Sequence, residues 1–417
     1  MKKILAVAMF LSILTILMLA CATTTSTANA DASEQAIKEA EQARIDSLDY
    51  AIKIELSLGL EYHKNAQYTD AIPHFKKIIY ELDPSEQRAW KYLADSYFRL
   101  DHPDSAFAAY TEGIEKFPDM SYLHRGLAIL YQKMASEGEV EYMDSALAEY
   151  CTACRLDENE AYSAAQIGLI LLSRGNLDSS QVWFEISAKA DSNQIDIWEK
   201  LADIYMVRGN WEGVRKAYKN LTRIDPENTE YALNHGRAQA NTGDYENAIA
   251  TLNAYIESNP DDFKGYKYMG LVHSASGKYS LAQKSFVKAE DIAPDNIKLL
   301  LDIADTYIDM KQLSSANKYL RKARAIDPNS CQAIVVEGNI CVAKMRGEVS
   351  DEGVGVRDKL RFECCRDIYC RAASRGCERW SDVARMKMKY LDQFMPTAQE
   401  KKEFYFINPE LKGKICE

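Results

Sequence analysis

The chain is poor in turn-forming residues and in the residue that most often serves as a catalytic acid or base. Its 417 residues include only 19 glycines, 10 prolines and 6 histidines, and no histidine follows His273. The sequence has no Gly-rich phosphate loop and no H-E-x-x-H, G-x-S-x-G or EF-hand motif. Strand-like alternation is sparse as well. We therefore predict an all-α protein that is not an enzyme and that has no catalytic residue, metal site or cofactor.

An excess of positive charge is also lacking. The chain carries 62 acidic and 51 basic side chains, which gives a net charge of -11 at pH 7. A nucleic-acid partner requires a basic footprint that neutralises phosphates. We therefore expect no nucleic-acid partner. With 47% hydrophobic residues and 25 tyrosines, the chain can nevertheless bury a substantial core.

The first residues have the outline of an export signal. Lys2 and Lys3 precede the uncharged residues 4–20, as in secretory signals. The stretch ends in "MLAC" at residues 18–21, which resembles the lipobox of bacterial lipoproteins but has Met where Leu is usual and Leu where a small residue is usual. The resemblance implies that Cys21 is lipidated and becomes the mature N-terminus.

Two other fates of this segment stay open. Cleavage at the A-x-A site of residues 28–30 would release a soluble periplasmic protein, and an uncleaved anchor would fall short of the about 20 apolar residues needed to span a bilayer. In all three cases, lipidation, cleavage at residues 28–30 or an uncleaved anchor, the remainder of the chain is exported. It has no later apolar run long enough to cross a membrane. We expect residues 1–20 to be a signal peptide and residues 21–33 a lipidated, flexible tether. The expected location is the periplasmic face of the envelope, as an outer-membrane lipoprotein that contacts the membrane only through its lipid.

The body of the chain repeats with a fixed period. Pro226, Pro260, Pro294 and Pro328 are evenly spaced in the sequence. The segment "WEKLADIYMVRGNW" matches the W-x2-L-G-x2-Y pattern, and "AWKYLADSYFRL" and "LLLDIADTYIDM" repeat it. The proline spacing and this pattern resemble the tetratricopeptide repeat family.

The resemblance covers eight repeats over residues 52–330, with one insertion of six residues between the helices of the third repeat. The repeats begin near Ile52, Gln87, Ser121, Ala161, Ile195, Thr229, Phe263 and Ile297. The family resemblance implies an α-solenoid of about eight to nine helix hairpins in a right-handed superhelix with a concave inner surface. We expect a capping helix over residues 34–51 before the first repeat.

The period continues into a Cys-rich ninth hairpin over residues 331–377, followed by a cap and tail over residues 378–417. The ninth hairpin is degenerate, with helices expected at 331–346 and 357–374, and a capping helix is expected from Glu378 to Phe394. Gly338 occupies the small-residue position of its first helix.

The cysteines of this hairpin are candidates for disulfides. In an antiparallel hairpin, residues at one height have nearly constant sums of residue numbers, which pairs Cys341 with Cys364 or Cys365 and pairs Cys331 with Cys370 or Cys377. Export favours oxidation. A zinc site would need four cysteines to converge without a histidine or a C-x-x-C spacing, but a metal site and a mixture of free thiols remain alternatives. With Cys21 lipidated, nine cysteines remain, so at least one is expected to be unpaired or to form an intermolecular bond, and Cys416 is the candidate.

A separate C-x-x-C pair lies earlier in the chain, at Cys151 and Cys154. Arg155 follows where haem attachment would require histidine, and the pair lies in the middle of a predicted helix. At a spacing of i and i+3 the Cβ atoms are about 5 to 6 Å apart, beyond the usual disulfide range. We expect two small packing residues, with a strained or regulatory disulfide as the alternative.

The family resemblance implies that positions 2, 5, 9 and 12 of each first helix line a groove for peptides or partner domains. These positions form an apolar middle flanked by charged patches, which suits an extended or helical peptide. The candidate groove residues are Arg88, Lys91, Asp95, Phe98, Tyr122, Arg125, Ile129, Leu169, Leu172, Glu199, Asp203, Arg237, Lys264, Lys267 and Lys298. A solvated inner face that binds nothing is the competing interpretation.

Two classes of function follow from these patterns. The favoured one is a non-enzymatic scaffold or assembly factor of the bacterial cell envelope that binds a protein or peptide partner in its groove. The alternative is a metal-binding or redox-active protein that uses the C-terminal cysteine cluster.

Overall fold

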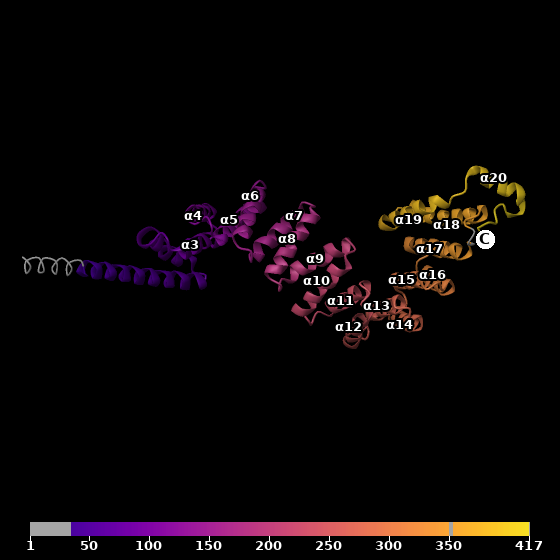
Figure 1. Cartoon of the computed structure of the whole chain (residues 1–417), viewed down its shortest axis with the longest axis horizontal. Helices are drawn as coiled ribbons and strands as arrows, with labels where there is room; N and C mark the ends of the chain where they lie inside the picture. Colours follow the sequence, from indigo (N-terminus) through magenta and orange to yellow (C-terminus); the bar gives the residue numbers. More distant parts are fainter. Residues whose placement is uncertain (1–34, 350–352, 417) are drawn as a thin grey trace, which may run out of the picture. The chain divides into compact units, whose positions relative to one another are not determined.

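The computed structural model describes residues 35–349 and 353–416. Every regular element within these ranges is helical, and consecutive helices pair as antiparallel hairpins (Figure 1). The chain divides into two compact units, the first ending at Ser192 and the second beginning at Asn193. The predicted all-α repeat fold is confirmed.

Unit 1 begins with a helix over residues 35–64, which precedes α2 as the first helix of a hairpin. A π-helical turn, Ile78–Leu82, extends α2. The remaining helices of the unit are α2 (Tyr68–Lys77), α3 (Gln87–Arg99), α4 (Pro103–Lys116), α5 (Ser121–Ser136), α6 (Tyr142–Leu156), α7 (Ala161–Ser173) and α8 (Leu177–Ala190).

Unit 2 contains four regular hairpins, a longer hairpin and two final helices. The hairpin helices are α9 (Ile195–Val207), α10 (Trp211–Ile224), α11 (Thr229–Asn241), α12 (Tyr245–Ser258), α13 (Phe263–Ala275), α14 (Tyr279–Ile292), α15 (Ile297–Asp309) and α16 (Leu313–Ile326). They are followed by α17 (Cys331–Glu348), α18 (Val356–Ser374), α19 (Glu378–Leu391) and α20 (Ala398–Ile407), with single 3-10 turns at Asp392–Phe394 and Pro409–Leu411.

The repeat period sets where the helices begin. Helices α3, α5, α7, α9, α11, α13 and α15 start at the residues where the sequence places repeats two to eight. Within each hairpin, the turn requires a left-handed backbone, which glycine adopts without steric cost. Glycines with φ between 67° and 81° supply it once per repeat in four successive repeats, at Gly175, Gly209, Gly243 and Gly277. Three other hairpins use residues with side chains at φ between 57° and 60°, namely Ala66, Asp101 and Lys311.

The six-residue insertion of the third repeat is divided between a helix and a turn. Helix α5 has 16 residues, whereas the other first helices α3, α7 and α9 have 13 each. The insertion therefore adds nearly one helical turn to α5 before the loop at residues 137–141, where Gly138 has a φ of 123°.

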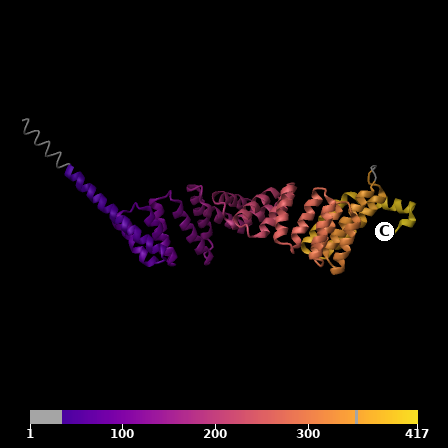
Figure 2. The ribbon, with the colours of Figure 1, turned by 90° about the horizontal axis from the view of Figure 1, so that it is seen from below.

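The N-terminal helix differs from the predicted arrangement. The expected cap over residues 34–51 is continuous with the first helix of the first repeat, and residues 35–50 are all exposed. This half of the helix projects beyond the hairpins of unit 1 (Figure 2). The predicted signal peptide, Cys21 and the tether at residues 21–33 lie outside the described residues. No helix in the described part of the chain is both long and apolar enough to cross a membrane.

The C-terminal cap is more extensive than predicted. Helix α19 packs against α17 and α18, as expected for a capping helix. The tail then forms α20, which was not predicted and which packs against α18. An ion pair of 2.6 Å between Lys359 of α18 and Glu400 of α20 links the two helices. The Lys359 ammonium and a backbone N–H of Thr397 lower the pKa of Glu400 to about 2.

Candidate functional site

Unit 1 has a hollow on the face formed by its first helices. Its volume is about 530 Å³. The predicted groove residues Lys91, Asp95 and Phe98 of α3 and Tyr122, Arg125 and Ile129 of α5 line it, together with Tyr162 of α7. The structure therefore brings six predicted groove residues from two neighbouring repeats into one hollow.

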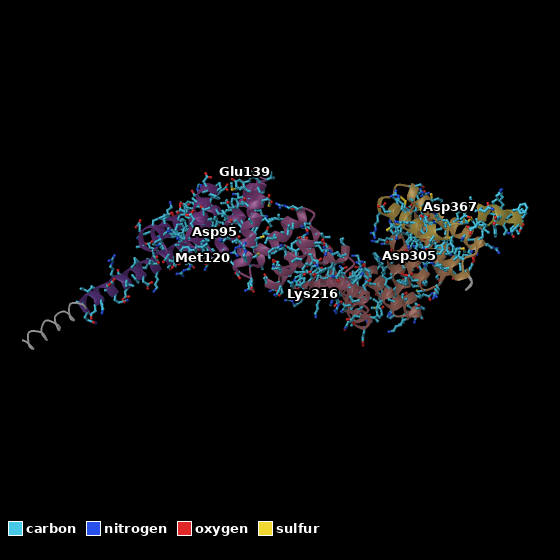
Figure 3. The ribbon with its side chains drawn as sticks, turned by 45° about the horizontal axis from the view of Figure 1, so that its top comes forward. Asp95, Met120, Glu139, Lys216, Asp305 and Asp367 are labelled. Atoms are coloured by element: carbon cyan, nitrogen blue, oxygen red, sulfur yellow. A yellow bond between two sulfur atoms is a disulfide. The ribbon has the colours of Figure 1, made fainter. Side chains whose placement is uncertain are left out.

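Most charges in this hollow already have partners within the chain. Asp95, labelled in Figure 3, accepts a hydrogen bond of 2.8 Å from Nε2 of His63. Arg125 forms an ion pair of 2.9 Å with Glu160, whose side chain is only 5% exposed. The Lys91 ammonium lies 5.0 Å from the ring centre of Tyr122. These contacts join neighbouring repeats and leave little uncompensated charge for a ligand.

One other predicted groove charge, and one tyrosine of the hollow, are also held by local contacts. Arg88 binds the carboxylate of Glu86 with two hydrogen bonds of 2.9 Å. Tyr122 donates a hydrogen bond of 3.1 Å to the carbonyl of Gln87. Burial, followed by the charge of Glu86, raises the pKa of Tyr122 to about 12. Tyr122 is therefore a neutral hydrogen-bond donor at physiological pH.

The predicted apolar middle lies on α7. Leu169 is 37% exposed and Tyr162 is 44% exposed, whereas Leu172 is half-buried. Their exposure leaves an apolar strip at the fourth repeat of unit 1. A partner that covered this strip would gain burial energy of roughly 25 cal/mol per Å² of apolar surface.

Unit 2 has a second hollow, of about 510 Å³. Arg237 of α11, Lys267 of α13 and Lys298 of α15 line it, so predicted basic residues from three consecutive repeats share one site. Aromatic and cap residues not predicted for the groove complete the wall: Trp211 of α10, Tyr268 of α13, and Arg379 and Trp380 of α19.

The cations of this second hollow differ in how far they are neutralised. Lys267 forms an ion pair of 2.5 Å with Asp302. The Arg237 guanidinium lies 5.2 Å from the ring centre of Trp211 and 5.6 Å from that of Tyr268, so cation–π contacts hold it in place. Within the described ranges, neither Arg237 nor Lys298 forms a salt bridge.

The remaining predicted charges of unit 2 do not line the hollow. Lys264 forms an ion pair of 3.2 Å with Glu230, one repeat earlier. Glu199 accepts a hydrogen bond of 2.7 Å from the Tyr231 hydroxyl, and Asp203 is exposed. Of the predicted basic residues in these repeats, Lys298 therefore lies with Arg237 and Lys267 in the hollow, and Lys264 does not.

A half-buried acid also lines the same hollow. Asp305, labelled in Figure 3, accepts a hydrogen bond of 3.0 Å from the Asn339 amide, whose oxygen in turn accepts one of 2.8 Å from the Tyr369 hydroxyl. Burial is the largest effect on Asp305 and raises the pKa of its carboxyl. Asp305 is a second carboxylate in the lining of the hollow, beside Asp302.

Sequence reasoning missed the aromatic and cap contributions to this site. Trp211 belongs to a second helix, and Arg379 and Trp380 lie beyond the repeats, so a rule based on positions of first helices cannot find them. The only signal was the basic and aromatic pair "RW" shortly after Cys377, which was predicted as part of the cap alone.

The cysteine-rich end contains three disulfides. They join Cys331 to Cys377, Cys341 to Cys365, and Cys364 to Cys416. Cys416 was the candidate for an unpaired or intermolecular cysteine, but the tail after α20 returns to α18 and pairs it with Cys364. Cys370 is exposed and has a free thiol.

The earlier C-x-x-C pair lines a pocket of about 670 Å³ between α6 and α8 of unit 1. Cys151 and Cys154 are half-buried free thiols. Burial raises the pKa of both, that of Cys154 to about 12. Both are therefore protonated at neutral pH and poorly suited to nucleophilic or redox chemistry. Among the described residues, no three His, Cys, Asp or Glu side chains converge as a metal site would require.

Stacked hairpins of nearly equal length, with inner-face residues of neighbouring repeats lining shared hollows, define a helical repeat protein of the scaffold class. Family models described as tetratricopeptide repeat match residues 56–121, 199–263 and 274–334. The chain is a tetratricopeptide repeat protein, and its kind of function is that of a repeat scaffold for protein–protein interaction.

Similar proteins are distant in sequence. Superkiller protein 3 of Schizosaccharomyces pombe is 21% identical over 74% of this chain and 23% of its own length. The BBSome complex member BBS4 of Bos taurus is 22% identical over 72% of this chain and 55% of its own length. The chain thus spans about a quarter to about half of these relatives. A solved tetratricopeptide repeat protein from Parabacteroides merdae is 15% identical, with a TM-score of 0.43 over 73% of this chain and 98% of its own.

Proposed function

We propose that this protein is a non-enzymatic scaffold or assembly factor of the bacterial cell envelope. In this proposal, its repeats bind a protein or peptide partner on their inner face, and it binds no nucleic acid. The signal-like N-terminus and the lipobox-like residues 18–21 support export and lipidation of Cys21, with the folded part on the periplasmic side of the outer membrane. Three disulfides in the C-terminal cap fit an oxidising compartment.

One observation carries the binding proposal. Inner-face cations of three consecutive repeats line the hollow of unit 2, and two of them, Arg237 and Lys298, form no salt bridge in the described chain. Other inner-face charges pair with neighbouring repeats, as Arg125 does with Glu160 and Lys264 does with Glu230. These two cations, Arg237 and Lys298, lie in a hollow with aromatic rings and have no carboxylate partner among the described residues, so they are available to bind a partner.

The alternative of a metal-binding or redox-active protein has less support. Six of the seven cysteines from Cys331 to Cys416 form disulfides, which leaves only Cys370 of α18 as a thiol among these seven. One equivalent of zinc on the purified protein, with free thiols released after chelation, would favour this alternative over the scaffold.

The test is cross-linking in intact cells followed by affinity capture and mass spectrometry of envelope partners. We expect Arg237→Glu and Lys298→Glu each to reduce capture of a specific partner about tenfold, as expected when a charge pair at an interface is reversed. Lys264→Glu is the matched control, because Lys264 has the same position in α13 as Lys298 has in α15 but lies outside the hollow.

Two results would contradict binding at a defined site on the inner face. Unchanged capture of every envelope partner by Arg237→Glu and Lys298→Glu would refute binding at this face. An equal loss with Lys264→Glu would indicate a general effect of charge and not a defined site. Circular dichroism of each variant checks that the helices remain folded.

A further inference from the structure

The first residues of the cap helix α19 belong to the hollow of unit 2. Arg379 and Trp380 line it beside Arg237, Lys267 and Lys298, although they follow the last repeat in sequence. Trp380 is half-buried and packs on the apolar cluster that α17 and α18 form with α19. Arg379 is exposed, lies 5.8 Å from the ring centre of Trp380, and has no salt bridge in the part of the chain that the structure describes.

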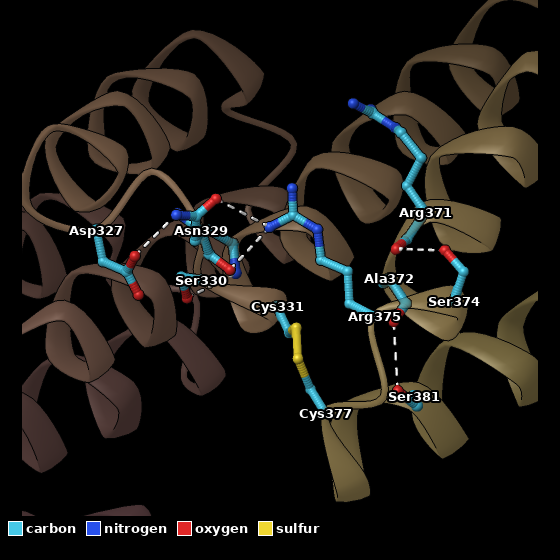
Figure 4. Close-up of a disulfide and its surroundings, with 11 residues drawn as sticks. Asp327, Asn329, Ser330, Cys331, Arg371, Ala372, Ser374, Arg375, Cys377 and Ser381 are labelled. Atoms are coloured by element: carbon cyan, nitrogen blue, oxygen red, sulfur yellow. Dashed lines mark hydrogen bonds between the residues drawn. A yellow bond between two sulfur atoms is a disulfide. The ribbon is translucent and has the colours of Figure 1, made fainter.

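The start of α19 is held from two sides (Figure 4). Cys377, the residue before the helix, forms a disulfide with Cys331 at the start of α17. Ser381 is only 2% exposed and donates a hydrogen bond of 3.3 Å to the carbonyl of Ala372 in α18. Arg379 and Trp380 lie between these two attachments, so their position depends on both.

A third contact fixes the loop that leads into α19. The Arg375 guanidinium donates a hydrogen bond of 3.0 Å to the carbonyl of Asn329, shortly before α17. The turn at residues 375–377 is therefore tied to the start of α17 by one covalent bond and to the residues just before α17 by one charged hydrogen bond. Such support holds side chains in a fixed geometry and lowers the entropy that binding would otherwise cost.

The hollow has an excess of positive charge and several aromatic faces. Four cations line it, Arg237, Lys267, Lys298 and Arg379, against two carboxylates, Asp302 and Asp305. Lys267 pairs with Asp302, whereas Arg237, Lys298 and Arg379 form no salt bridge among the described residues. Guanidinium groups bind carboxylates through two parallel hydrogen bonds. Trp211, Tyr268 and Trp380 offer apolar surface for an aliphatic or aromatic side chain. Because the protein as a whole carries a charge of -11, long-range attraction of a polyanion such as nucleic acid is disfavoured.

We propose that Arg379 and Trp380 of the cap helix complete a binding site for an acidic peptide segment that also bears a large apolar side chain. The Cys331–Cys377 disulfide is the positioning element of this site. The proposal rests on partner binding at the inner face and adds the chemistry of the ligand and the role of the cap. In this site, the carboxylates of the segment pair with Arg237, Lys298 and Arg379, and its apolar side chain packs between the aromatic residues.

The test measures binding of a fluorescein-labelled peptide of alternating glutamate and leucine with one central tryptophan. A matched peptide has glutamine in place of every glutamate, and fluorescence anisotropy with the full chain gives both dissociation constants. We expect the glutamate peptide to bind at least about tenfold more tightly, with an affinity that falls as salt rises. Equal affinity for the two peptides would overturn the assignment of an acidic ligand.

Substitutions in α19 distinguish the contribution of the cap helix to peptide binding from that of the repeats. We expect Arg379→Glu to weaken binding of the glutamate peptide about tenfold and to reduce its salt dependence, and Trp380→Ala to weaken binding of both peptides. Arg385→Glu is the matched control, because Arg385 lies on the same helix, pairs with Asp382 and does not line the hollow. Unchanged binding in Arg379→Glu and Trp380→Ala would overturn the role of the cap.

The disulfide is tested by the double variant Cys331→Ser, Cys377→Ser. We expect weaker peptide binding with unchanged helical content, whereas Cys370→Ser, which removes a free thiol, should bind as the wild type does. Full affinity in the double variant would refute the positioning role.

Two outcomes separate this proposal from the proposed function. If Arg237→Glu abolishes binding while Arg379→Glu does not, the inner face still binds partners and only the cap contribution is wrong. If the peptide binds as expected but no envelope partner is captured, the site stands and the envelope function fails.

Discussion

At the scale of single residues, the hairpins depend on one small residue that faces one aromatic ring. In the ninth hairpin, Gly338 of α17 faces Tyr369 of α18, and a Cβ added to Gly338 would lie 2.5 Å from that ring. Gly270 and Phe286 form the same pair in the seventh repeat, at 2.4 Å. The ring occupies the space that any larger residue would need, so the glycine sets how closely the two helices approach.

Gly338→Ala should therefore destabilise the protein by about 1–3 kcal/mol, because overpacking exceeds the gain of up to about 1 kcal/mol from replacing a helical glycine. Gly347→Ala in the same helix is the matched control, since nothing lies within 4 Å of its added Cβ. It should be neutral or stabilising by up to about 1 kcal/mol. Urea unfolding followed by circular dichroism measures both. A Gly338→Ala variant as stable as Gly347→Ala would contradict this account of the packing.

Single residues also show which features of the site could be predicted from the sequence and which could not. The spacing of inner positions placed Lys91, Arg125, Arg237 and Lys267 on one predicted face, and in the structure the first two line one hollow and the last two line another. It could not show that Arg125 pairs with Glu160, because that partner lies one repeat away and the pairing depends on side-chain conformation. A charge at an inner position can therefore serve as a link between repeats, as Arg125 does.

At the scale of elements, the C-terminal cap replaces the neighbour that the last hairpin lacks. A terminal repeat exposes the face that every other repeat buries against the next one. Here α19 covers α17 and α18, and the disulfide between Cys341 and Cys365 joins the two helices beneath it. The buried cluster of Ile334, Phe362 and Ala384 fills the space between them.

Removing that disulfide by Cys341→Ser, Cys365→Ser should destabilise the cap by about 2–4 kcal/mol, mainly because the unfolded chain becomes less constrained. Hydrogen exchange should become faster in α17 and α18 and stay unchanged in unit 1. Cys370→Ser is the control, since Cys370 is free and exposed. Uniform acceleration across both units, or none in the cap, would contradict a local stabilising role.

Most elements could be predicted from sequence because residues within each repeat determine where its helices begin. The repeat period carries the turn, the small residue and the aromatic residue together, so the starts of α3, α5, α7, α9, α11, α13 and α15 follow from it. Helix α20 and the pairing of Cys416 with Cys364 could not be predicted, because no repeated pattern governs a tail that folds back on α18. The participation of Arg379 and Trp380 in the hollow has the same long-range origin.

At the scale of the whole molecule, the chain forms two compact units divided between Ser192 and Asn193. That point lies between two hairpins, after α8 and before α9. In repeat proteins each hairpin contacts its neighbours, and stability is approximately a sum of hairpin and interface contributions. A cut between hairpins therefore removes one interface, whereas a cut within a hairpin removes its own core.

Residues 35–192 and 193–417 should therefore fold when expressed separately, each with a helical spectrum and a cooperative unfolding transition. A matched pair divided after Gly209, between α9 and α10, should lose more helix, because α10 would lack its partner. Circular dichroism and thermal unfolding of the four fragments measure this. Equal behaviour of the two divisions would show that the hairpin is not the unit of stability.

The linked disulfides of the cap also limit how far the chain can be stretched. The shortest covalent path from Cys331 to Cys416 follows the backbone to Cys341, crosses to Cys365, and passes from the adjacent Cys364 to Cys416. Fully extended, the backbone of that path measures about 40 Å, against about 290 Å for the whole segment without the bonds. Under a force that pulls on both ends of the protein, the cap keeps a nearly constant contour length, and the repeats before it supply the extension.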